Sequence, residues 1–438
     1  MIATIVKNIK NIFGYGVREQ LKKAMETIHE SITDCSNDND VGNRLLVEAF
    51  CGWGKGMAVY QSLLDNLIVE DISVALFPSL SLVDQFYNDY ISEGEGEGEA
   101  FNVLFVCSST ERRERGGVRD ENAKNKNKKT TTNSKEVKKF INKEGKKIIA
   151  TTYHSIGTVV EALEGRIVNY ATFDEAHNAT RDTSLEYVLG DKPFFRTGTF
   201  FTATPQKINE YPMKRIARLS FFQGVEDSVL SNIDLRVDIG KKEDGDSVGH
   251  IKKIYESIAR ATLETENNKI LSFHAYSTTE VENSKTTAKA FADVRKLKAA
   301  FKKVAANEFP DKVGYYKKFK VLCITAETKG RTKILNNFDS TKDDEVVLLC
   351  SCKTIGEGVD TKNANMCVFV DPKTSTAEII QNIGRIMRFS EGRICTVLMP
   401  LRIDYDPYRE AGSDKERDEV IRTNCANNEG NYSNIPRC

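Results

Sequence analysis

The sequence lacks the features of several large protein classes. In its 438 residues no apolar run approaches the roughly 20 residues that a membrane-spanning helix needs. Residues 1–16 mix Ile and Val with Lys and Asn, and so lack the apolar core of a signal peptide. Neither charge sign is in excess, because 63 basic side chains balance 63 acidic ones. We expect a soluble intracellular protein with no membrane partner, in which any nucleic-acid binding needs a local basic surface.

Closely paired cysteines are also missing. The ten cysteines include no Cys-x-x-Cys pair, which is typical of a reducing compartment rather than of a disulfide-stabilised secreted domain. Cys350 and Cys352 are two residues apart at the end of an apolar run, so a strand would turn both side chains to one face. Two interpretations stay open, a pair of metal ligands or two buried structural thiols.

The chain does contain two series of short apolar runs that alternate with stretches of helical spacing. Such alternation predicts parallel α/β sheets with crossover helices. The expected strands are residues 45–50, 74–78, 103–107, 148–152, 171–175 and 200–204, then 270–274, 321–325, 346–350, 366–370 and 394–399. The expected helices include residues 17–35, 57–67, 250–267, 288–306 and 377–387. The predicted fold class is α/β, with two parallel-sheet domains in tandem.

Changes of composition suggest where the domains divide. Residues 93–147 carry an acidic Gly-Glu run and then a Lys-, Asn- and Thr-rich stretch, which we expect to be a flexible insert. That insert is either a solvated loop or a nonspecific phosphate-binding surface. The predicted division is residues 1–238 for the first domain, 239–249 for a charged hinge, 250–403 for the second domain and 404–438 for a polar tail.

A glycine-rich turn follows the first predicted strand. Gly52, Trp53, Gly54 and Lys55 stand between that strand and a helical stretch, which is the context of a phosphate-binding loop. The N–H groups at the start of the helix would face the phosphates, and Lys55 would reach them as a point charge. The sequence therefore predicts a nucleotide site at this turn.

Residue 56 departs from the phosphate-loop pattern. The pattern has Ser or Thr after the lysine, and its hydroxyl ligates Mg²⁺. Here Gly56 and then Met57 follow, and neither supplies a hard oxygen ligand. Two outcomes are open: a water molecule replaces the hydroxyl and hydrolysis continues, or nucleotide binding survives without catalysis.

A second motif lies at the end of another predicted buried strand. The run Ala171–Thr172–Phe173 leads into Asp174 and Glu175, and carboxylates in this position can handle a metal ion at the carboxyl edge of a sheet. Taken alone, the tetrapeptide Asp-Glu-Ala-His fits a solvated helix start equally well. Its neighbours in the sequence favour the functional interpretation.

Five motifs in one order resemble those of superfamily 2 helicases of the DEAD/DEAH type. The chain looks closest to restriction-enzyme motors, including type III restriction subunits and similar proteins of large DNA viruses, from about residue 18 to residue 388. The motifs are Gly52–Lys55, Asp174–His177, Phe201–Pro205, Gly356–Asp360 and Gln381–Arg388. The resemblance implies two RecA-like domains with an ATP cleft between them and a helicase or translocase that consumes ATP on DNA or RNA.

The resemblance also implies roles at the ATP site. ATP and Mg²⁺ would be the cofactors, with Asp174 holding the metal and Glu175 orienting or deprotonating the attacking water. The other implied nucleotide contacts are Gln20, Gly52, Trp53, Gly54, Lys55, Gly56, Gly358 and Asp360. Gln381, Arg385 and Arg388 would act as a catalytic set from the second domain, because their spacing puts them on one helix face. His177, Thr202 and Thr204 would couple hydrolysis to domain movement.

Nucleic acid is the implied partner. The candidate contacts are Ser79, Tyr153, Ser155, His274 and Thr354, although Ser79 fits a simple helix N-cap equally well. Three alternatives to a helicase remain open. They are a duplex translocase that does not unwind, a nucleotide- and nucleic-acid-binding scaffold with an inactive ATPase, and an unrelated phosphate-loop ATPase such as a transporter motor.

Overall fold

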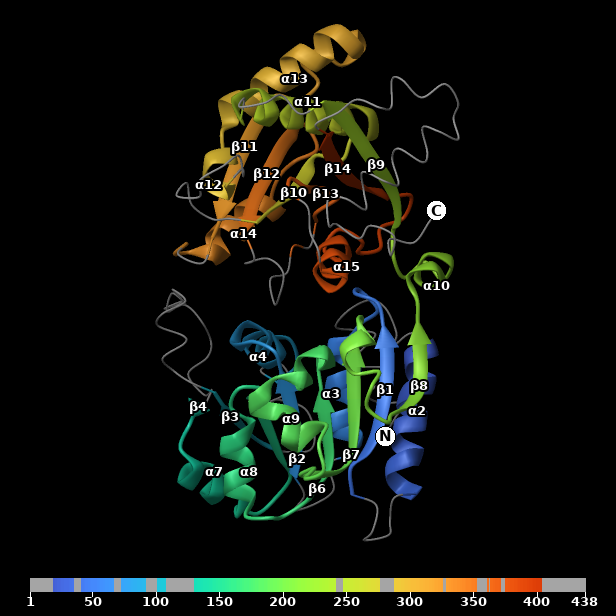
Figure 1. Ribbon diagram of the computed structural model, residues 1–438, viewed down its shortest axis with the longest axis vertical. Coiled ribbons are helices and arrows are strands. Elements are labelled where there is room, and N and C mark those ends of the chain that lie inside the picture. Colours follow the sequence, from blue (N-terminus) through green and yellow to red (C-terminus); the bar gives the residue numbers. More distant parts are fainter. Residues whose placement is uncertain are drawn as a thin grey trace. The chain divides into compact units, whose positions relative to one another are not determined.

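The computed structural model divides into two compact units, with the change at Asp227 and Ser228 (Figure 1). It describes residues 19–34, 41–66, 72–91, 101–107, 130–241, 247–275, 287–325, 328–352, 361, 363–371 and 375–403. Within these ranges no helix is long and apolar enough to cross a membrane. The polar tail, the acidic Gly-Glu run and the centre of the expected hinge lie outside them.

The first unit is built on an eight-stranded sheet whose described pairings are all parallel. The strand order is β4-β3-β5-β2-β6-β7-β1-β8. The strands are β1 (Asn43–Ala49), β2 (Ile72–Phe77), β3 (Asn102–Val106), β4 (Thr130–Thr131), β5 (Lys147–Thr152), β6 (Val168–Phe173), β7 (Phe195–Thr202) and β8 (Lys214–Leu219). Every residue of β2 and β5 is buried, as expected for central strands covered on both faces.

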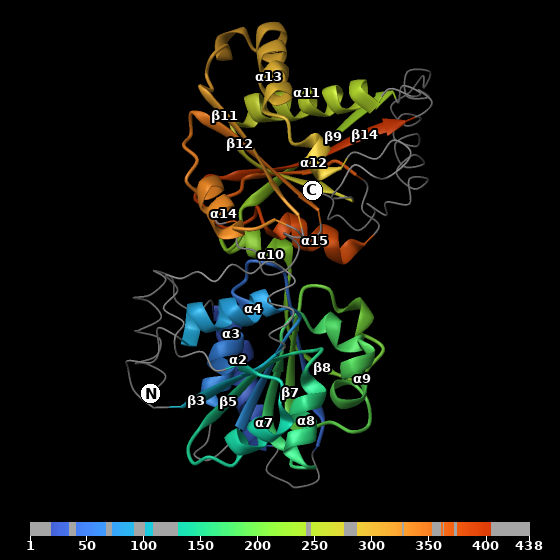
Figure 2. The ribbon, with the colours of Figure 1, turned by 90° about the vertical axis from the view of Figure 1, so that its left-hand side faces the viewer.

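Helices cover both faces of this sheet. They are α2 (Glu19–Asp34), α3 (Lys55–Asp65), α4 (Leu80–Phe86), η1 (Tyr87–Ile91), α7 (Ser134–Ile141), α8 (Ile156–Leu163), η3 (Ala176–Thr180), α9 (Asp182–Val188), η4 (Pro205–Lys207) and α10 (Phe221–Glu226). Figure 2 shows α3 and α4 on one face and α8 and α9 on the other. Right-handed crossovers require this, because the chain moves one way across the sheet from β1 to β3 and back from β4 to β7.

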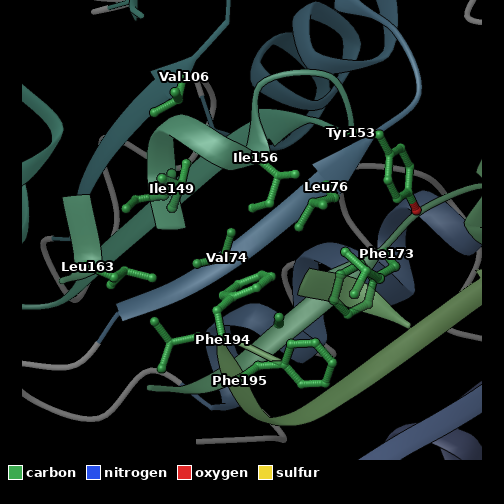
Figure 3. Packing of buried hydrophobic residues seen from close by; sticks show 14 of the residues in the cluster. Val74, Leu76, Val106, Ile149, Tyr153, Ile156, Leu163, Phe173, Phe194 and Phe195 are labelled. Carbon is green, nitrogen blue, oxygen red and sulfur yellow. The ribbon is translucent and has the colours of Figure 1, made fainter. Parts of the chain in front are cut away.

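The core of the first unit lies where these helices meet the sheet. Val74, Leu76 and Ile149 of the central strands pack against Ile156 of α8 (Figure 3). Phe173, at the end of β6, stacks on Phe200 of β7 with a centroid distance of 4.3 Å. The strand that ends on Asp174 is therefore held firmly on its apolar side.

The second unit has its own parallel sheet and its own core. The strand order is β11-β12-β10-β13-β14-β9. The strands are β9 (Asn232–Lys241), β10 (Lys269–His274), β11 (Lys318–Ile324), β12 (Glu345–Cys352), β13 (Met366–Phe369) and β14 (Ile394–Ile403). The helices are α11 (Ser247–Thr265), α12 (Ala288–Phe291), α13 (Val294–Glu308), η5 (Pro310–Lys312), α14 (Arg331–Asp339) and α15 (Thr376–Gly384). The prediction of two parallel α/β domains is confirmed.

Two edge strands were not expected. β8 (Lys214–Leu219) and β9 (Asn232–Lys241) have no counterpart among the expected strands, and at 241 β9 reaches into the expected hinge. Both strands are rich in charged side chains, which is usual at sheet edges and hides the apolar pattern. β4 and α7 likewise lie inside the segment expected to be an insert.

Two helices differ from their expected extents. The helix expected at 288–306 is divided, because Asp293 accepts hydrogen bonds from the N–H groups of Arg295 and Lys296 and so caps a new helix. The helix expected to continue to 387 ends at Gly384. The break at Asp293 depends on a side-chain cap, which periodicity does not reveal.

Candidate functional site

The phosphate-like loop joins β1 to α3 as predicted. Gly52 and Gly54 both have φ of +88°, in the left-handed region where a side chain is strained. Gly54 is the N-cap of α3, and its carbonyl accepts the N–H of Met57 at 3.1 Å and of Ala58 at 3.2 Å. The two glycines thus fold the chain back so that the helix starts directly beyond the end of β1.

Lys55 is the first residue of α3 and is buried. Its Nζ donates to the carbonyl of Ala49, the last residue of β1, at 3.1 Å, and lies 3.8 Å from Oε1 of Glu175. A buried ammonium needs such oxygen partners. The lysine is thereby fixed between the loop and the acidic motif of β6.

Asp174 follows directly on β6 and is also buried. Its N–H donates to the carbonyl of Leu76 at 2.9 Å, and its Oδ1 accepts the N–H of Glu175 at 3.0 Å. Burial, together with the neighbouring Glu175 charge, raises the pKa of the Asp174 carboxyl to about 7, and Lys55 opposes that rise. A nearby cation would favour its ionised form.

Glu175 has an unusual backbone and a carboxylate oxygen that lacks a hydrogen bond. Its φ of +45° is rare for a residue with a side chain, and its carbonyl accepts both the N–H and the Nδ2 of Asn178 at 3.0 Å. Within the described structure its buried Oε2 has no hydrogen-bond partner. The turn therefore places this carboxylate oxygen where it can contact a bound group that is not part of the protein.

The three predicted coupling residues meet. Nδ1 of His177 lies 3.2 Å from Oγ1 of Thr202 and 3.2 Å from Oγ1 of Thr204, and it is 3.6 Å from Oε2 of Glu175. Burial lowers the pKa of His177, and Glu175 partly offsets this. A neutral imidazole therefore joins the end of β7 to the acidic turn after β6.

These groups converge because of the strand order. β6, β7 and β1 are consecutive in the sheet and parallel, so their carboxyl ends share one edge. That edge carries Asp174 and Glu175, then Thr202 and Thr204, then the loop with Lys55. Ligands of open parallel sheets bind at such an edge.

Trp53 points inward rather than toward a ligand. The side chain is fully buried, and its Nε1 donates to the carbonyl of Ser220 at 3.1 Å. The tryptophan side chain thus anchors the loop to the connection between β8 and α10.

A side chain from another element fills the space beside Gly56, the position that lacks a hydroxyl. A Cβ atom on Gly56 would lie only 2.9 Å from the hydroxyl oxygen of Tyr90, in the π-helical turn η1. Tyr90 is not among the site residues that the sequence motifs predict. The glycine at a position that usually carries a side chain was the available signal, because it implies a neighbour that fills the space.

The candidate nucleic-acid contacts of the first unit differ in how deeply they are buried. Ser79 and Ser155 are half-buried at the carboxyl ends of β2 and β5, which are neighbours in the sheet, and Ser79 caps α4 by accepting the N–H of Leu82. Tyr153 is fully buried, and its hydroxyl donates to the carbonyl of Asp174 at 2.9 Å (Figure 3). It is a support of the acidic turn and not a surface residue, contrary to our expectation.

His274 in the second unit is likewise fully buried. Its Nε2 lies 3.0 Å from Oγ of Ser272, and its ring packs on Phe291. It does not reach the surface expected of a nucleic-acid contact. The cysteines Cys350 and Cys352 are buried on β12, and no cluster of three or more metal-ligating side chains occurs in the described ranges. Burial raises the pKa of Cys350 to about 12, as expected of a structural thiol.

The predicted arginine pair does not share a helix face. Gln381 is buried on α15, Arg385 is the C-cap of that helix, and Arg388 lies beyond it in an isolated bridge to Leu230. The hydroxyl of Ser231 donates to the Arg388 carbonyl at 3.0 Å and draws the chain out of the helix. The two arginines are therefore presented by different backbone segments, which corrects the helical assignment.

Several predicted site residues are outside the described structure. Thr354, Gly358 and Asp360 fall between residues 353 and 360. Gln20 is in the first turn of α2, where the backbone is described but the side chain is not.

Comparison with known proteins places the two units in known families. The sequence profile of "Type III restriction enzyme, res subunit" matches residues 15–207, and that of "Helicase conserved C-terminal domain" matches residues 251–390. A comparison with curated protein sequences gives no match.

Solved structures share the fold at low identity. "ATP-dependent Type ISP restriction-modification enzyme LlaBIII bound to DNA" has a TM-score of 0.63 at 16% identity, over 94% of this chain and 29% of that one. A nuclease-deletion mutant of the Type ISP enzyme LlaGI has a TM-score of 0.56 at 17% identity, over 93% and 28%. A putative HsdR subunit fragment of a type I restriction enzyme from Vibrio vulnificus YJ016 has a TM-score of 0.51 at 17% identity, over 91% and 66%.

The first two of these proteins are much longer than this chain, which spans less than a third of each. The two matched profiles follow one another in the expected order and together cover most of the sequence. With a restriction-type motor domain followed by a helicase C-terminal domain, the chain belongs to the superfamily 2 helicases of the restriction-enzyme-motor type.

Proposed function

We propose that the chain is a nucleic-acid motor that hydrolyses ATP at the carboxyl edge of the first sheet. The observation that carries the proposal is the meeting of Lys55, Asp174 and Glu175 at that edge, with the two carboxylates buried or half-buried around one ammonium. A loop with a helix N-terminus, a lysine and an acidic pair suits a nucleoside triphosphate.

The residues fit a divalent cation as well. The Oε2 of Glu175 lacks a hydrogen bond, and burial together with the Glu175 charge raises the pKa of Asp174, so a cation would stabilise both carboxylates in their ionised form. Mg²⁺ at this place would neutralise phosphate charge and favour ionised Asp174. Asp174 would hold it, and Lys55 would hold the phosphates.

Glu175 is then the group that orients or deprotonates the attacking water. Its carboxylate is held by the left-handed turn, and His177 lies 3.6 Å from Oε2. A change at Glu175 during hydrolysis would reach Thr202 and Thr204 through the imidazole. Gln381, Arg385 and Arg388 of the second unit complete the proposed catalytic set.

Nucleic acid is the proposed partner. The similar LlaBIII enzyme is bound to DNA in its solved structure, which supports a polymer track for a chain of this fold. Ser79 and Ser155, on neighbouring strands, remain proposed phosphate contacts of the first unit. The ATP cleft between the units and the roles of Thr354, Gly358 and Asp360 stay predictions.

The first test is steady-state ATP hydrolysis by the full chain, alone and with single-stranded DNA, single-stranded RNA or duplex. We expect one polymer to stimulate hydrolysis and Lys55→Ala to abolish it. Glu175→Gln should keep nucleotide binding and lower the rate by about 10²- to 10⁴-fold, because proton transfer or water positioning is lost. Glu210→Gln, an exposed carboxylate of the same unit, is the matched control. Hydrolysis that survives Lys55→Ala would contradict the proposal.

One observation favours a second function, a nucleotide- and nucleic-acid-binding scaffold with an impaired ATPase. Gly56 supplies no hydroxyl for the metal. If the wild-type chain binds ATP and nucleic acid but shows no hydrolysis with any polymer, this second function replaces the motor.

A further inference from the structure

Gly56 and Tyr90 lie next to each other in the structure, although 34 positions separate them in the sequence. A Cβ on Gly56 would lie 2.9 Å from the Tyr90 hydroxyl oxygen, 3.5 Å from Cε2 and 3.6 Å from Cζ. The end of the tyrosine therefore occupies the space beside residue 56. A threonine or serine at position 56 could not be accommodated unless Tyr90 moved.

The Tyr90 ring is not free to swing away. It stacks on Tyr60 with a centroid distance of 5.4 Å and an interplanar angle of 20°, and it packs on Phe86 at 5.8 Å. Tyr60 is on α3, one helical turn after Gly56, so both lie on the same helix face. Tyr90 thus lies along α3 from Tyr60 to Gly56, with its hydroxyl at the start of the helix.

The π-helical turn makes this placement possible. In η1, Tyr87 turns into the core and meets Phe105 edge to face at 5.4 Å, while Tyr90 faces α3 and is half-buried. Wide turns of this type occur often at functional sites. Tyrosine suits such a place, because its ring packs among apolar groups while its hydroxyl reaches a polar environment.

We propose that the Tyr90 hydroxyl supplies, from η1, the polar contact to the metal–nucleotide complex that residue 56 cannot supply from the loop. The proposal rests on the proposed function of the same site. As a hydrogen-bond donor and acceptor, the phenol would contact a water of the metal shell, since Mg²⁺ usually keeps several waters. Tyr90 is a positioning residue, and Gly56 makes room for it.

A hydroxyl restored at position 56 would meet Tyr90. Gly56→Thr places its Cβ against the Tyr90 oxygen and should displace one of the two groups. Its effect therefore depends on residue 90. Gly56→Thr alone should weaken nucleotide binding, whereas Gly56→Thr combined with Tyr90→Phe removes the clash and returns a hydroxyl to the site.

The experiment is calorimetric titration of the full chain with ADP and with a non-hydrolysable ATP analogue, each with Mg²⁺ and with EDTA. The readout is the ratio of affinities with and without Mg²⁺. Tyr90→Phe should lower this ratio about tenfold, the size of one hydrogen bond to a charged group. The double variant should regain it. Tyr60→Phe removes a hydroxyl from the same aromatic stack and should leave the ratio unchanged.

If Tyr90 had only a packing role, Tyr90→Phe would leave the ratio of affinities with and without Mg²⁺ unchanged. If Tyr90→Phe keeps the wild-type ratio while Lys55→Ala weakens binding, the inference is overturned and the proposed function stands. If the wild-type chain binds neither nucleotide, the proposed function fails and the inference with it. Recovery in the double variant decides the case even where Tyr90→Phe lowers stability, because both proteins carry the same Tyr90→Phe change.

Discussion

At the scale of single residues, the acidic turn after β6 is held from behind by a tyrosine. The Tyr153 hydroxyl donates to the carbonyl of Asp174, and the ring is packed in the core of the first unit. This places the residue one hydrogen bond from the proposed metal ligand. Its contribution to function is through the position of Asp174.

Tyr153→Phe should therefore lower the free energy of unfolding by about 1–3 kcal/mol, because it leaves a buried carbonyl without its donor. Chemical denaturation measures this. Nucleic-acid affinity, measured by fluorescence anisotropy, should not fall more than stability explains. Unchanged stability with weaker nucleic-acid binding would restore the surface role that we first expected. Tyr187→Phe, a partly buried tyrosine packed at the edge of the same core, serves as the comparison.

The motif residues could be predicted from sequence because each is tied to a strand end. Lys55, Asp174 and Thr202 follow apolar runs, and parallel order brings such ends together. Tyr90 and Tyr153 could not, because their roles depend on side-chain direction after folding. Tyr153 followed a strand like the others, and only its burial shows that it turns inward.

At the scale of elements, β7 has no room for a side chain at Gly198. A Cβ there would lie 2.6 Å from Cε2 of Phe195 and 2.8 Å from Cε2 of Phe173. These rings support the strands that carry the acidic turn and the hydroxyls. The glycine allows three phenylalanines to pack where β6 meets β7.

Gly198→Ala should destabilise the first unit by about 1–3 kcal/mol, because overpacking forces the rings from their positions. Gly157→Ala is the matched control, since Gly157 is in α8 and a Cβ there meets nothing within 4 Å. That substitution should be neutral or stabilising by up to about 1 kcal/mol. Equal unfolding midpoints for the two variants would refute this account of β7.

One carboxylate links β12 to two lysines of its neighbour β11. Glu345 of β12 accepts from Lys320 at 2.7 Å and lies 3.2 Å from Lys318, both on β11. These two lysines lower the pKa of Glu345 to about 2. The ionised form is thus favoured in the folded state, so its stabilisation is present above the ordinary carboxyl pKa and is lost as the pH falls toward 2.

Glu345→Gln should therefore lower the melting temperature at pH 7, and its difference from wild type should shrink between about pH 4.5 and about pH 2. Calorimetry at several pH values measures this. A difference that stays constant down to pH 3 would show that the carboxylate contributes by packing rather than by charge. Asp344→Asn, beside it but more exposed, should have the smaller effect.

Element ends were the least predictable part of the fold. The central strands were correct because long apolar runs admit few other interpretations. β8 and β9 were missed because Lys214, Arg215 and Arg218 in one, and Asp234 and Arg236 in the other, break the apolar pattern at sheet edges. The end of α15 was missed because the apolar spacing of residues 377–387 continues past Gly384, where the helix ends.

At the scale of the whole molecule, each unit has a separate sheet and a separate hydrophobic core. The residues of one core belong to one unit only. Equilibrium unfolding of the full chain should therefore not be two-state. A single cooperative transition would need coupling that the two cores do not themselves provide.

We expect two transitions in calorimetry. Gly198→Ala should move the transition of the first unit, and Glu345→Gln that of the second, because each change is confined to one unit. Hydrogen exchange of peptides from β7 and β12 assigns the transitions to the units. If both variants shift the same transition by the same amount, the units unfold together.

The indole of Trp53 gives the first unit a mechanical property. It ties the loop that follows β1 to a carbonyl 167 residues later, shortly before the chain leaves that unit. A force on the segment that leaves the first unit would therefore act on the loop, and a displacement of the loop would shift that segment. Since this is the only tryptophan of the sequence, a change in its emission would report a displacement of the loop relative to the segment that leaves the unit.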